Sequence, residues 1–522
     1  MKLTLSWLKD HLETNADLQT ISATLTSIGL EVESITDASE SLKAFTVAKI
    51  LSAERHPEAD KLQVCKVESN AGELQIVCGA PNARAGIFVA LAQEGAFIPG
   101  ANFTIKKTKI RGVESNGMLC SFEELGIAGD SSSIIELPEA PIGSSVASAL
   151  GLDDPLIDIA ITPNRADCLG VRGVARDLAA AGIGNLKHLA SSIQHSEKKS
   201  SLNAECRMPN AISVTITTEN CPQFIGCHIS GVKNGESPEW LKKRLTAIGL
   251  RPISALVDIT NYFTYDLGRP LHVYDAKKLA GNLTVRDAKD GEKIKALNGK
   301  EYGLSQGMCV IADANNVQAI GGVIGGEDSG CTQDTTEVFL EVALFTPSHV
   351  ATTGRTLQID SDARYRFERG VDPAFVEEGA KRAISMILEL CGGAASELVI
   401  AGKTPEWKRS ISFNPECVRT LGGVEISQEK ISEILSFLGF LNAESQILTP
   451  PSWRADIEGE ADIVEEILRI HGYDNLAVLP LPKVPEVRLP AVESIPQQLL
   501  ARRIELVAVV DVIASERQAV VQ

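Results

Sequence analysis

The densest group of residues able to do chemistry lies in the segment 451–475, which carries four closely spaced carboxylates. A helix beginning near Glu460 would place three of them on one face, at positions i, i+3 and i+4. The fourth lies on the chain leading into this helix and can fold back toward the same point. Oxygen ligands of this kind and number suit Mg²⁺. The candidate ligands are Asp456, Asp462, Glu465 and Glu466.

The same carboxylates also have a purely structural explanation. Acidic side chains stabilise the N-terminal turn of a helix, and Glu465 lies four residues before Arg469, the spacing of an ion pair along a helix. Composition alone favours this explanation over a metal site.

A second constellation extends from Arg251 to Gly370. Its glycine cluster at 320–326 has the spacing GGxxGG, which matches neither a dinucleotide-binding loop nor a phosphate loop and instead allows a ligand to approach the backbone closely. A lone His272 is more often structural than catalytic. Glu341 stands inside an apolar strand at 338–343, where a half-buried carboxylate requires a partner.

A third candidate is a basic strip in a β-rich region of Gly-, Pro- and Asn-punctuated runs at 39–150. It consists of Lys106, Lys107, Lys109 and Arg111. Such a strip could contact backbone phosphates of a nucleic acid. The region as a whole holds more acidic than basic residues, and it has no local run of aromatic side chains for base stacking. A solvated charged hairpin is therefore an equally good interpretation.

Composition limits what these groups can belong to. The chain has 522 residues, enough for three to five domains, with ordinary hydrophobic and charged fractions of 44% and 23%. It has no apolar run long enough to cross a membrane, and its N-terminus lacks a signal-peptide core, so we expect a cytoplasmic protein. The eleven Cys without a CxxC pair suit reduced thiols. The net charge of −18 argues against wrapping nucleic acid by bulk electrostatics.

Periodicity predicts an α+β, multidomain chain. Three similar helices end at Gly, at 21–30, 241–250 and 431–440, and the first is capped by Asp17. Short strands fill 40–150, helix returns at 156–184, and 185–205 is a polar linker. The Pro-rich segment 479–490 is an extended linker, and the last 30 residues form one helix.

In combination, several motifs resemble the bacterial phenylalanine–tRNA ligase beta-subunit family. The resemblance runs in order from residue 1 to about 478. It is carried by HPEADKL, IVCGAPNAR, GVESNGMLCS, ITPNRADCLGVRGVARDLA, RPISALVDITNY, GRPLHVYD, GGVIGGEDSG and SDARYRFERGVD.

The resemblance implies a domain order. It comprises a helical module at 1–38 packed with 151–200, an OB-fold β-barrel binding tRNA at 39–150, an α+β editing domain at 206–400, a small B5-type α/β module with the metal-ligand helix at 401–478, and a linker with the start of a truncated catalytic-like domain at 479–522.

The resemblance also implies the function. We expect a subunit of an α₂β₂ ligase that joins phenylalanine to its tRNA with ATP and Mg²⁺, with the aminoacylation site on the partner alpha subunit. This chain would bind tRNA, through Lys106, Lys107, Lys109 and Arg111 if the basic strip is used, and hydrolyse misacylated tyrosyl-tRNA. The implied Mg²⁺ ligands are Asp456, Asp462, Glu465 and Glu466. The resemblance therefore favours a metal site over the purely structural explanation of these carboxylates. The implied editing residues are Arg251, His272, Gly325, Glu341, Ser361 and Ala363.

Two other functions fit the same motifs. The chain could be a non-catalytic tRNA-binding scaffold, or a free-standing tRNA deacylase that needs no partner. Assembly with an alpha subunit is uncertain because, after Arg503, the sequence departs from the family pattern.

Overall fold

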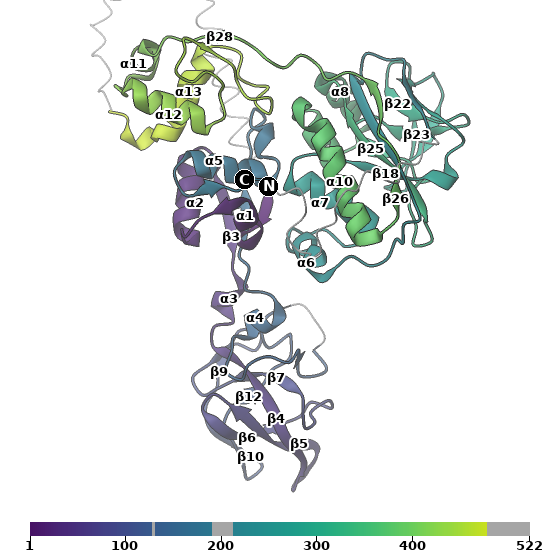
Figure 1. The fold of residues 1–522 in the computed structure, drawn as a ribbon. Coiled ribbons are helices and arrows are strands. Elements are labelled where there is room, and N and C mark those ends of the chain that lie inside the picture. The colour runs from purple at the N-terminus through teal and green to yellow at the C-terminus, as the bar shows by residue number, and fades with distance from the viewer. Residues whose placement is uncertain (128–130, 190–211, 478–522) are drawn as a thin grey trace, which may run out of the picture. The chain divides into compact units, whose positions relative to one another are not determined.

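The computed structural model describes residues 1–127, 131–189 and 212–477, with helices and strands mixed throughout (Figure 1). Met1–Asn475 form one compact unit, and Leu476–Gln522 form a second, of which only the first two residues are described. The predicted linker at 479–490 and the predicted terminal helix therefore lie outside the described residues. Within the described part, every helix is too short or too polar to cross a membrane.

The N-terminal module is built from two segments distant in sequence. Strands β1, β14 and β3 form an antiparallel sheet with β14 in the centre. Helix α2 is capped by Asp17, whose carboxylate accepts the Thr20 N–H at 2.8 Å, and it ends just before Gly29, as the sequence predicts. The elements are β1 Lys2–Thr4, α1 Leu5–His11, β2 Leu12–Glu13, α2 Leu18–Ser27, β3 Val32–Thr36, β14 Leu156–Ile159, η1 Ala166–Cys168, α5 Val171–Ala180 and β15 Asn185–Leu186.

One expectation for this module is wrong. Helix was predicted over 156–184, but Leu156–Ile159 form strand β14 and helix α5 begins only at Val171. The four residues are strand because β1 and β3, from the opposite end of the module's sequence, supply hydrogen bonds on both sides. Local periodicity does not register partners so distant in the chain.

The β-rich region contains one large antiparallel sheet in the order β12-β7-β4-β5-β6, with β13 also on β7. The described strands do not pair into a closed barrel, so the predicted OB-fold barrel stays a prediction. The elements are α3 Ala38–Ser41, β4 Phe45–His56, β5 Ala59–Ser69, β6 Gly72–Cys78, β7 Phe88–Ala92, β8 Phe97–Ile98, β9 Phe103–Thr104, β10 Thr108–Ile110, β11 Val113–Ser115, β12 Met118–Leu119, β13 Glu136–Leu137 and α4 Val146–Leu150.

The segment from residue 212 to 402 holds two five-stranded sheets with helices. One sheet has the order β16-β19-β22-β23-β24, and the other has the order β18-β25-β17-β26 with β27 also on β17. The elements are β16 Val214–Ile216, β17 Gln223–Ser230, α6 Glu239–Ala247, α7 Ala255–Asp266, β18 His272–Asp275, η2 Ala276–Lys278, β19 Leu283–Asp287, β20 Lys293–Lys295, β21 Glu301–Gly303, β22 Cys309–Ala312, β23 Val317–Ile320, β24 Ile324–Gly325, β25 Glu337–Leu344, α8 Pro347–Leu357, α9 Asp362–Phe367, η3 Pro373–Phe375, α10 Val376–Cys391, β26 Ala394–Ala395 and β27 Val399–Gly402.

The last described module is small and mostly helical. A two-stranded sheet accompanies three helices, and the third of these, α13, begins at Glu460 as the sequence predicts. The elements are β28 Ile411–Ser412, α11 Glu416–Gly422, α12 Gln428–Phe437, β29 Ile447–Leu448, α13 Glu460–His471 and η4 Tyr473–Asn475.

A buried ion network joins helix α13 to helix α5 of the N-terminal module. The Arg469 guanidinium donates to Asp177 at 2.8 Å, to Glu466 at 2.6 and 3.1 Å, and to the Ile28 carbonyl at 3.0 Å. Arg165 donates to the same Asp177 oxygen, Oδ2, also at 2.8 Å, and all these side chains are almost fully buried. A buried charge is tolerated in a folded protein only when it is paired and hydrogen-bonded in this way. The arginines hold the pKa of Glu466 well below its ordinary value of 4.5, against the effect of burial.

Substituting Arg469→Met should therefore destabilise the chain strongly, because it leaves the Asp177 and Glu466 carboxylates buried with fewer counter-charges. We expect a loss of about 3–5 kcal/mol in the free energy of unfolding, measured by urea denaturation. Lys381→Met, which removes an exposed ion pair with Glu377 on α10, is the matched control and should change stability little. An equal, small effect of both substitutions would contradict the structural role of the network.

Candidate functional sites

Glu341 is a buried carboxyl at the centre of strand β25. Its backbone pairs in register with His272 on β18 and with Gly226 on β17, so neighbouring strands flank it on both sides. The hydroxyl of Tyr274 donates a hydrogen bond to Glu341 Oε2. Burial raises the pKa of Glu341 from 4.5 to about 7, although the Tyr274 hydrogen bond opposes the shift. The strand thus presents a carboxyl that is neutral or charged near physiological pH and already accepts a phenol.

His272 lies against a glycine that leaves room for its ring. A Cβ added to Gly325 would lie 2.3 Å from His272 Cε1, so a side chain there would displace the imidazole. His272 Nε2 is buried and has no hydrogen-bond partner among the described residues. Burial lowers the pKa of His272 to about 4, which makes the ring neutral at physiological pH. A neutral, unpartnered imidazole nitrogen can accept or donate a hydrogen bond to a ligand.

Tyr274 is the residue of this group that sequence reasoning missed. Its ring packs edge-on against His272 with centroids 4.4 Å apart, and its hydroxyl reaches Glu341. The signal was present in the sequence: His272 and Tyr274 stand two residues apart, and residues two apart on a strand share a face. Pairing this face with Glu341 requires knowing that β18 lies beside β25, which local sequence does not reveal.

The other predicted editing residues occupy different positions. Ser361 caps helix α9, donates to the Val323 carbonyl at 2.6 Å and thereby ties the helix to the glycine cluster. Ala363, two residues on, packs against the apolar core of this domain. Arg251 is exposed between α6 and α7, and no contact in the described part of the chain links it to the others. The structure thus gathers His272, Gly325 and Glu341.

The four candidate metal ligands do not converge on one point. Both Asp456 oxygens accept from Arg454 at 2.8 Å, and Glu466 is held by Arg454 and Arg469. Asp462 accepts the backbone N–H groups of Glu458 and Gly459 at the start of α13, at 2.8 and 2.9 Å, and Glu465 is exposed. As arranged, this set does not fit Mg²⁺, because two of its members already bind arginine. The expected pair between Glu465 and Arg469 is also replaced, since Arg469 binds Glu466.

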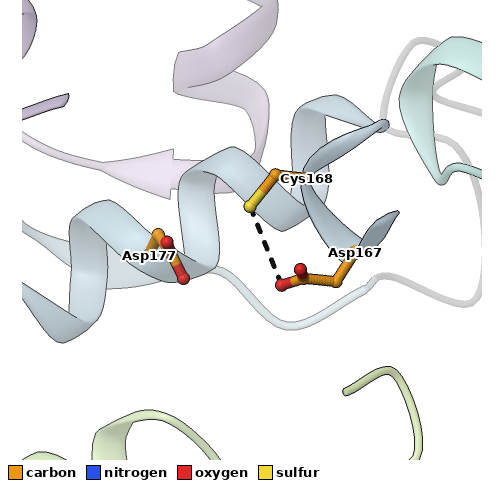
Figure 2. A group of neighbouring side chains, drawn as sticks. All are labelled: Asp167, Cys168 and Asp177. Carbon is orange, nitrogen blue, oxygen red and sulfur yellow. Dashed lines mark hydrogen bonds between the residues drawn. The ribbon is translucent and has the colours of Figure 1, made fainter. Parts of the chain in front are cut away.

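A different group does meet the spacing of a metal site. Asp167, Cys168 and Asp177 place their ligand atoms within 4.8 Å of one another (Figure 2). Arg165, however, donates to all three, at 2.8 to 3.1 Å. Burial also raises the pKa of the Cys168 thiol well above its ordinary value, which disfavours the thiolate that metals bind. The carboxylates of this group already bind the Arg165 guanidinium and the thiol stays protonated, so the group does not fit a metal ion.

The basic strip lies beside a groove of the β-rich region. The groove encloses about 480 Å³, and Lys106 and the half-exposed Phe103 line it together with the backbone at Gly79. Lys107 and Lys109 form exposed ion pairs with Glu94 and Glu114, while Arg111 occupies the turn between β10 and β11. Two exposed phenylalanines lie on strands β8 and β9: Phe97 and Phe103 are 51% and 44% exposed. They pair with Thr104 and Ile98, so the two rings lie on opposite faces of the hairpin. Sequence reasoning did not single out Phe103 on the groove wall, because it sought a local run of aromatic side chains.

Comparison with known proteins tests the resemblance. Three family models match the chain: "Putative tRNA binding domain" at 45–145, "B3/4 domain" at 220–392 and "tRNA synthetase B5 domain" at 411–473. The phenylalanine–tRNA ligase beta subunit of Paramagnetospirillum magneticum is 55% identical over 92% of this chain and 60% of its own length. That of Novosphingobium aromaticivorans is 50% identical over 97% of this chain and 63% of its own length. The predicted resemblance to phenylalanine–tRNA ligase beta subunits is confirmed.

The extent of the match has a limit. The chain spans about 60% of the length of the phenylalanine–tRNA ligase beta subunits it matches. Among solved structures, an N-terminal fragment of the phenylalanyl-tRNA synthetase beta-subunit from Pyrococcus horikoshii is 16% identical, with a TM-score of 0.32, and covers 61% of this chain and 88% of its own. A likeness this distant carries no argument about the fold of this chain.

Glu341 should make stability depend on pH. The folded chain holds its proton more tightly than the unfolded chain, so unfolding releases a proton and stability falls as pH rises from about 4.5 to 7. The shift corresponds to about 3 kcal/mol at most. Glu341→Gln should remove this component, whereas Tyr274→Phe should move it to higher pH. Urea unfolding of the three proteins from pH 4.5 to 8 measures it, and identical pH profiles for wild type and Glu341→Gln would contradict the assignment.

The arginine pairing predicts weak metal binding by this chain alone. Arg454 and Arg469 already neutralise Asp456 and Glu466. Neither millimolar Mg²⁺ nor its removal with EDTA should therefore shift the melting temperature by more than about 1 °C. An ion that did bind, at 100 times its Kd, would add about 2.7 kcal/mol to the free energy of unfolding. Differential scanning fluorimetry checks this. A clear stabilisation by Mg²⁺, lost in Asp462→Asn with Glu465→Gln, would show instead that the carboxylates exchange arginine for metal.

Proposed function

We propose that the chain supplies the tRNA-binding and editing parts of a phenylalanine–tRNA ligase beta subunit, and that it hydrolyses tyrosine from misacylated tRNA. The observation that carries the proposal is the buried Glu341 carboxyl, which accepts a tyrosine hydroxyl within the domain itself. The 50–55% identity to beta subunits over most of the chain supports the same assignment.

The chemistry of Glu341 suits selection of tyrosine over phenylalanine. A pocket built for phenylalanine rejects an isostere with one added hydroxyl only by about 10², so a second site is needed. Tyr274 occupies Glu341 Oε2, which leaves Oε1 to accept a phenol from the substrate. A phenylalanine side chain would bury Oε1 without a donor, and an unpaired buried polar group is costly. Glu341 would therefore favour binding of the tyrosine of tyrosyl-tRNA, which is to be hydrolysed, and disfavour the phenylalanine of phenylalanyl-tRNA, which must not be hydrolysed.

His272 and the glycine cluster would orient the reacting end of the substrate. The buried His272 Nε2 needs a partner, and an ester oxygen or the attacking water would supply it. Gly325 leaves the space in which the imidazole lies, and Ser361 fixes helix α9 to the same loop through Val323. In this scheme Ser361 and Ala363 shape the site and Arg251 contacts the tRNA. The neutral His272 ring carries one proton: with it on Nε2 the ring would donate to an ester oxygen, and with it on Nδ1, Nε2 would accept a proton from the attacking water.

Recognition of tRNA would use the β-rich region. The match to a putative tRNA-binding domain at 45–145 supports this, as does the groove with Lys106 and Phe103 on its wall. Phe103 offers a face for a base, and Lys106 offers a cation for a phosphate, the usual combination for single-stranded nucleic acid. Such local contacts are compatible with a chain of net charge −18. An OB-fold for this region is part of the proposal.

Formation of phenylalanyl-tRNA would require a partner. In the proposed α₂β₂ assembly the alpha subunit carries the site for phenylalanine and ATP. A Mg²⁺ ion at Asp456, Asp462, Glu465 and Glu466 stays part of the proposal only if Arg454 leaves Asp456 and Glu466 on assembly. No step of the editing reaction depends on that ion.

Reconstitution separates this function from its alternatives. The purified chain is given tyrosyl-tRNA alone and then with the alpha subunit, while tyrosine release, phenylalanine charging and complex mass are measured. Hydrolysis that needs the alpha subunit supports an editing subunit, and full hydrolysis by the chain alone indicates a free-standing deacylase. Binding of tRNA without hydrolysis in either mixture indicates a scaffold.

Substituting Glu341→Ala tests the selecting residue. We expect at least a tenfold loss in the rate of tyrosyl-tRNA hydrolysis, because the substrate phenol loses its acceptor, while phenylalanine charging by the complex persists. Glu327→Ala, which removes an exposed ion pair with Lys295 in the same domain, is the matched control. Unchanged clearance of tyrosyl-tRNA by the Glu341 variant would refute the role.

A further inference from the structure

A cavity of about 360 Å³ lies where helix α5, the loop at 370–375 and the segment around Trp453 meet. It shares no lining residue with the Glu341 site. Three arginines, Arg172, Arg176 and Arg269, line it, and aromatic side chains complete the wall. The lining also includes the carboxylates Asp167 and Asp372 and the aromatic residues Phe375 and Trp453.

The three guanidinium groups are incompletely compensated. Arg176 stacks on the Trp453 ring at 3.9 Å, and its NH1 is buried without a hydrogen-bond partner among the described residues, with Asp167 3.8 Å away. Arg172 donates only to a backbone carbonyl, that of Lys187, at 3.0 Å. Arg269 is almost fully buried and donates to the carbonyls of Ala343 and Asp372.

The two carboxylates on the cavity wall are engaged elsewhere. Both oxygens of Asp167 accept from Arg165, at 3.0 and 3.1 Å, and Asp372 Oδ1 accepts the Ala374 N–H at 2.9 Å. Formal charges on the wall are therefore three positive and two negative. Asp167 also lies 3.8 Å from Arg176 and Asp372 acts on Arg269, so one positive charge is left in excess. Burial and repulsion from Arg176 lower the pKa of Arg172 to about 10.

We propose that this arginine cavity binds a small phosphate-bearing anion. Guanidinium groups present paired N–H donors that match phosphate oxygens, and such charge-assisted bonds are strong where water is excluded. An anion would provide Arg176 NH1 with an acceptor and relieve the repulsion between Arg172 and Arg176. The enclosed volume limits the ligand to about the size of free phosphate or a mononucleotide, whose base would lie against Trp453 or Phe375.

The test uses the full 522-residue chain and inorganic phosphate as the probe, in a chloride buffer, by isothermal titration calorimetry. We expect one site per chain. Arg172→Gln and Arg176→Gln should each weaken binding about tenfold or more, and Arg172→Lys, which keeps the charge, should weaken it less. Arg419→Gln removes an exposed arginine of helix α11 and should leave binding unchanged. A melting curve for each variant establishes that it is folded.

A second arm distinguishes the source of the phosphate. Tighter binding of AMP than of inorganic phosphate supports a nucleotide whose base uses the aromatic wall, and Trp453→Leu should then remove the difference. Equal or weaker binding of AMP supports free phosphate. Absence of binding at 10 mM phosphate, or equal binding by folded Arg172→Gln, would overturn the proposal.

Discussion

The Arg469 guanidinium is the contact on which the arrangement of this chain most depends. It bonds Glu466 on its own helix, Asp177 on α5 and the Ile28 carbonyl that follows α2, so one side chain joins segments more than 400 residues apart. Removing these charges from water costs free energy, and this cost is offset only when every charged group has all of its hydrogen-bond partners. The module at 411–475 is therefore fixed to the N-terminal module by a polar connection with strict directional requirements, in addition to apolar packing.

This connection changes how the carboxylates at 456–466 should be understood. In the sequence they form a cluster of oxygen ligands. The spacing of Arg454 and Arg469 from these carboxylates does not indicate that the two arginines pair with them. In the fold, both arginines turn inward and neutralise the two carboxylates that would otherwise anchor a cation. A metal at this position would require the network to open. The Asp167, Cys168 and Asp177 group follows the same logic, with Arg165 as the internal counter-ion.

What the sequence could predict follows from the range of the interactions. Asp17 as a helix cap, the end of α2 before Gly29 and the start of α13 at Glu460 are local, and each was predicted correctly. Strand β14 was taken for helix because its partners are about 120 to 155 residues away along the chain. Glu341 could be singled out, since a carboxylate in an apolar strand is unusual, but Tyr274 as its donor depends on the pairing of β18 with β25. Contacts across sheets and between modules are what a single sequence leaves undetermined.

Glu341 and the arginine cavity represent opposite solutions to burying charge. No cation among the described residues pairs with the Glu341 carboxyl, so burial raises its pKa to about 7, and its charged form is best served by a neutral hydroxyl donor. The arginines of the cavity cannot lose their protons at physiological pH, so the electrostatic cost of burying them persists until an anion arrives. A site of the first kind selects by hydrogen bonding and responds to pH, while a site of the second kind selects by charge and responds to salt. In the two proposals the Glu341 site would bind a neutral phenol and the arginine cavity an anion. Each site would disfavour the other's ligand, because an anion would be repelled by Glu341 and a neutral group would leave the arginines uncompensated.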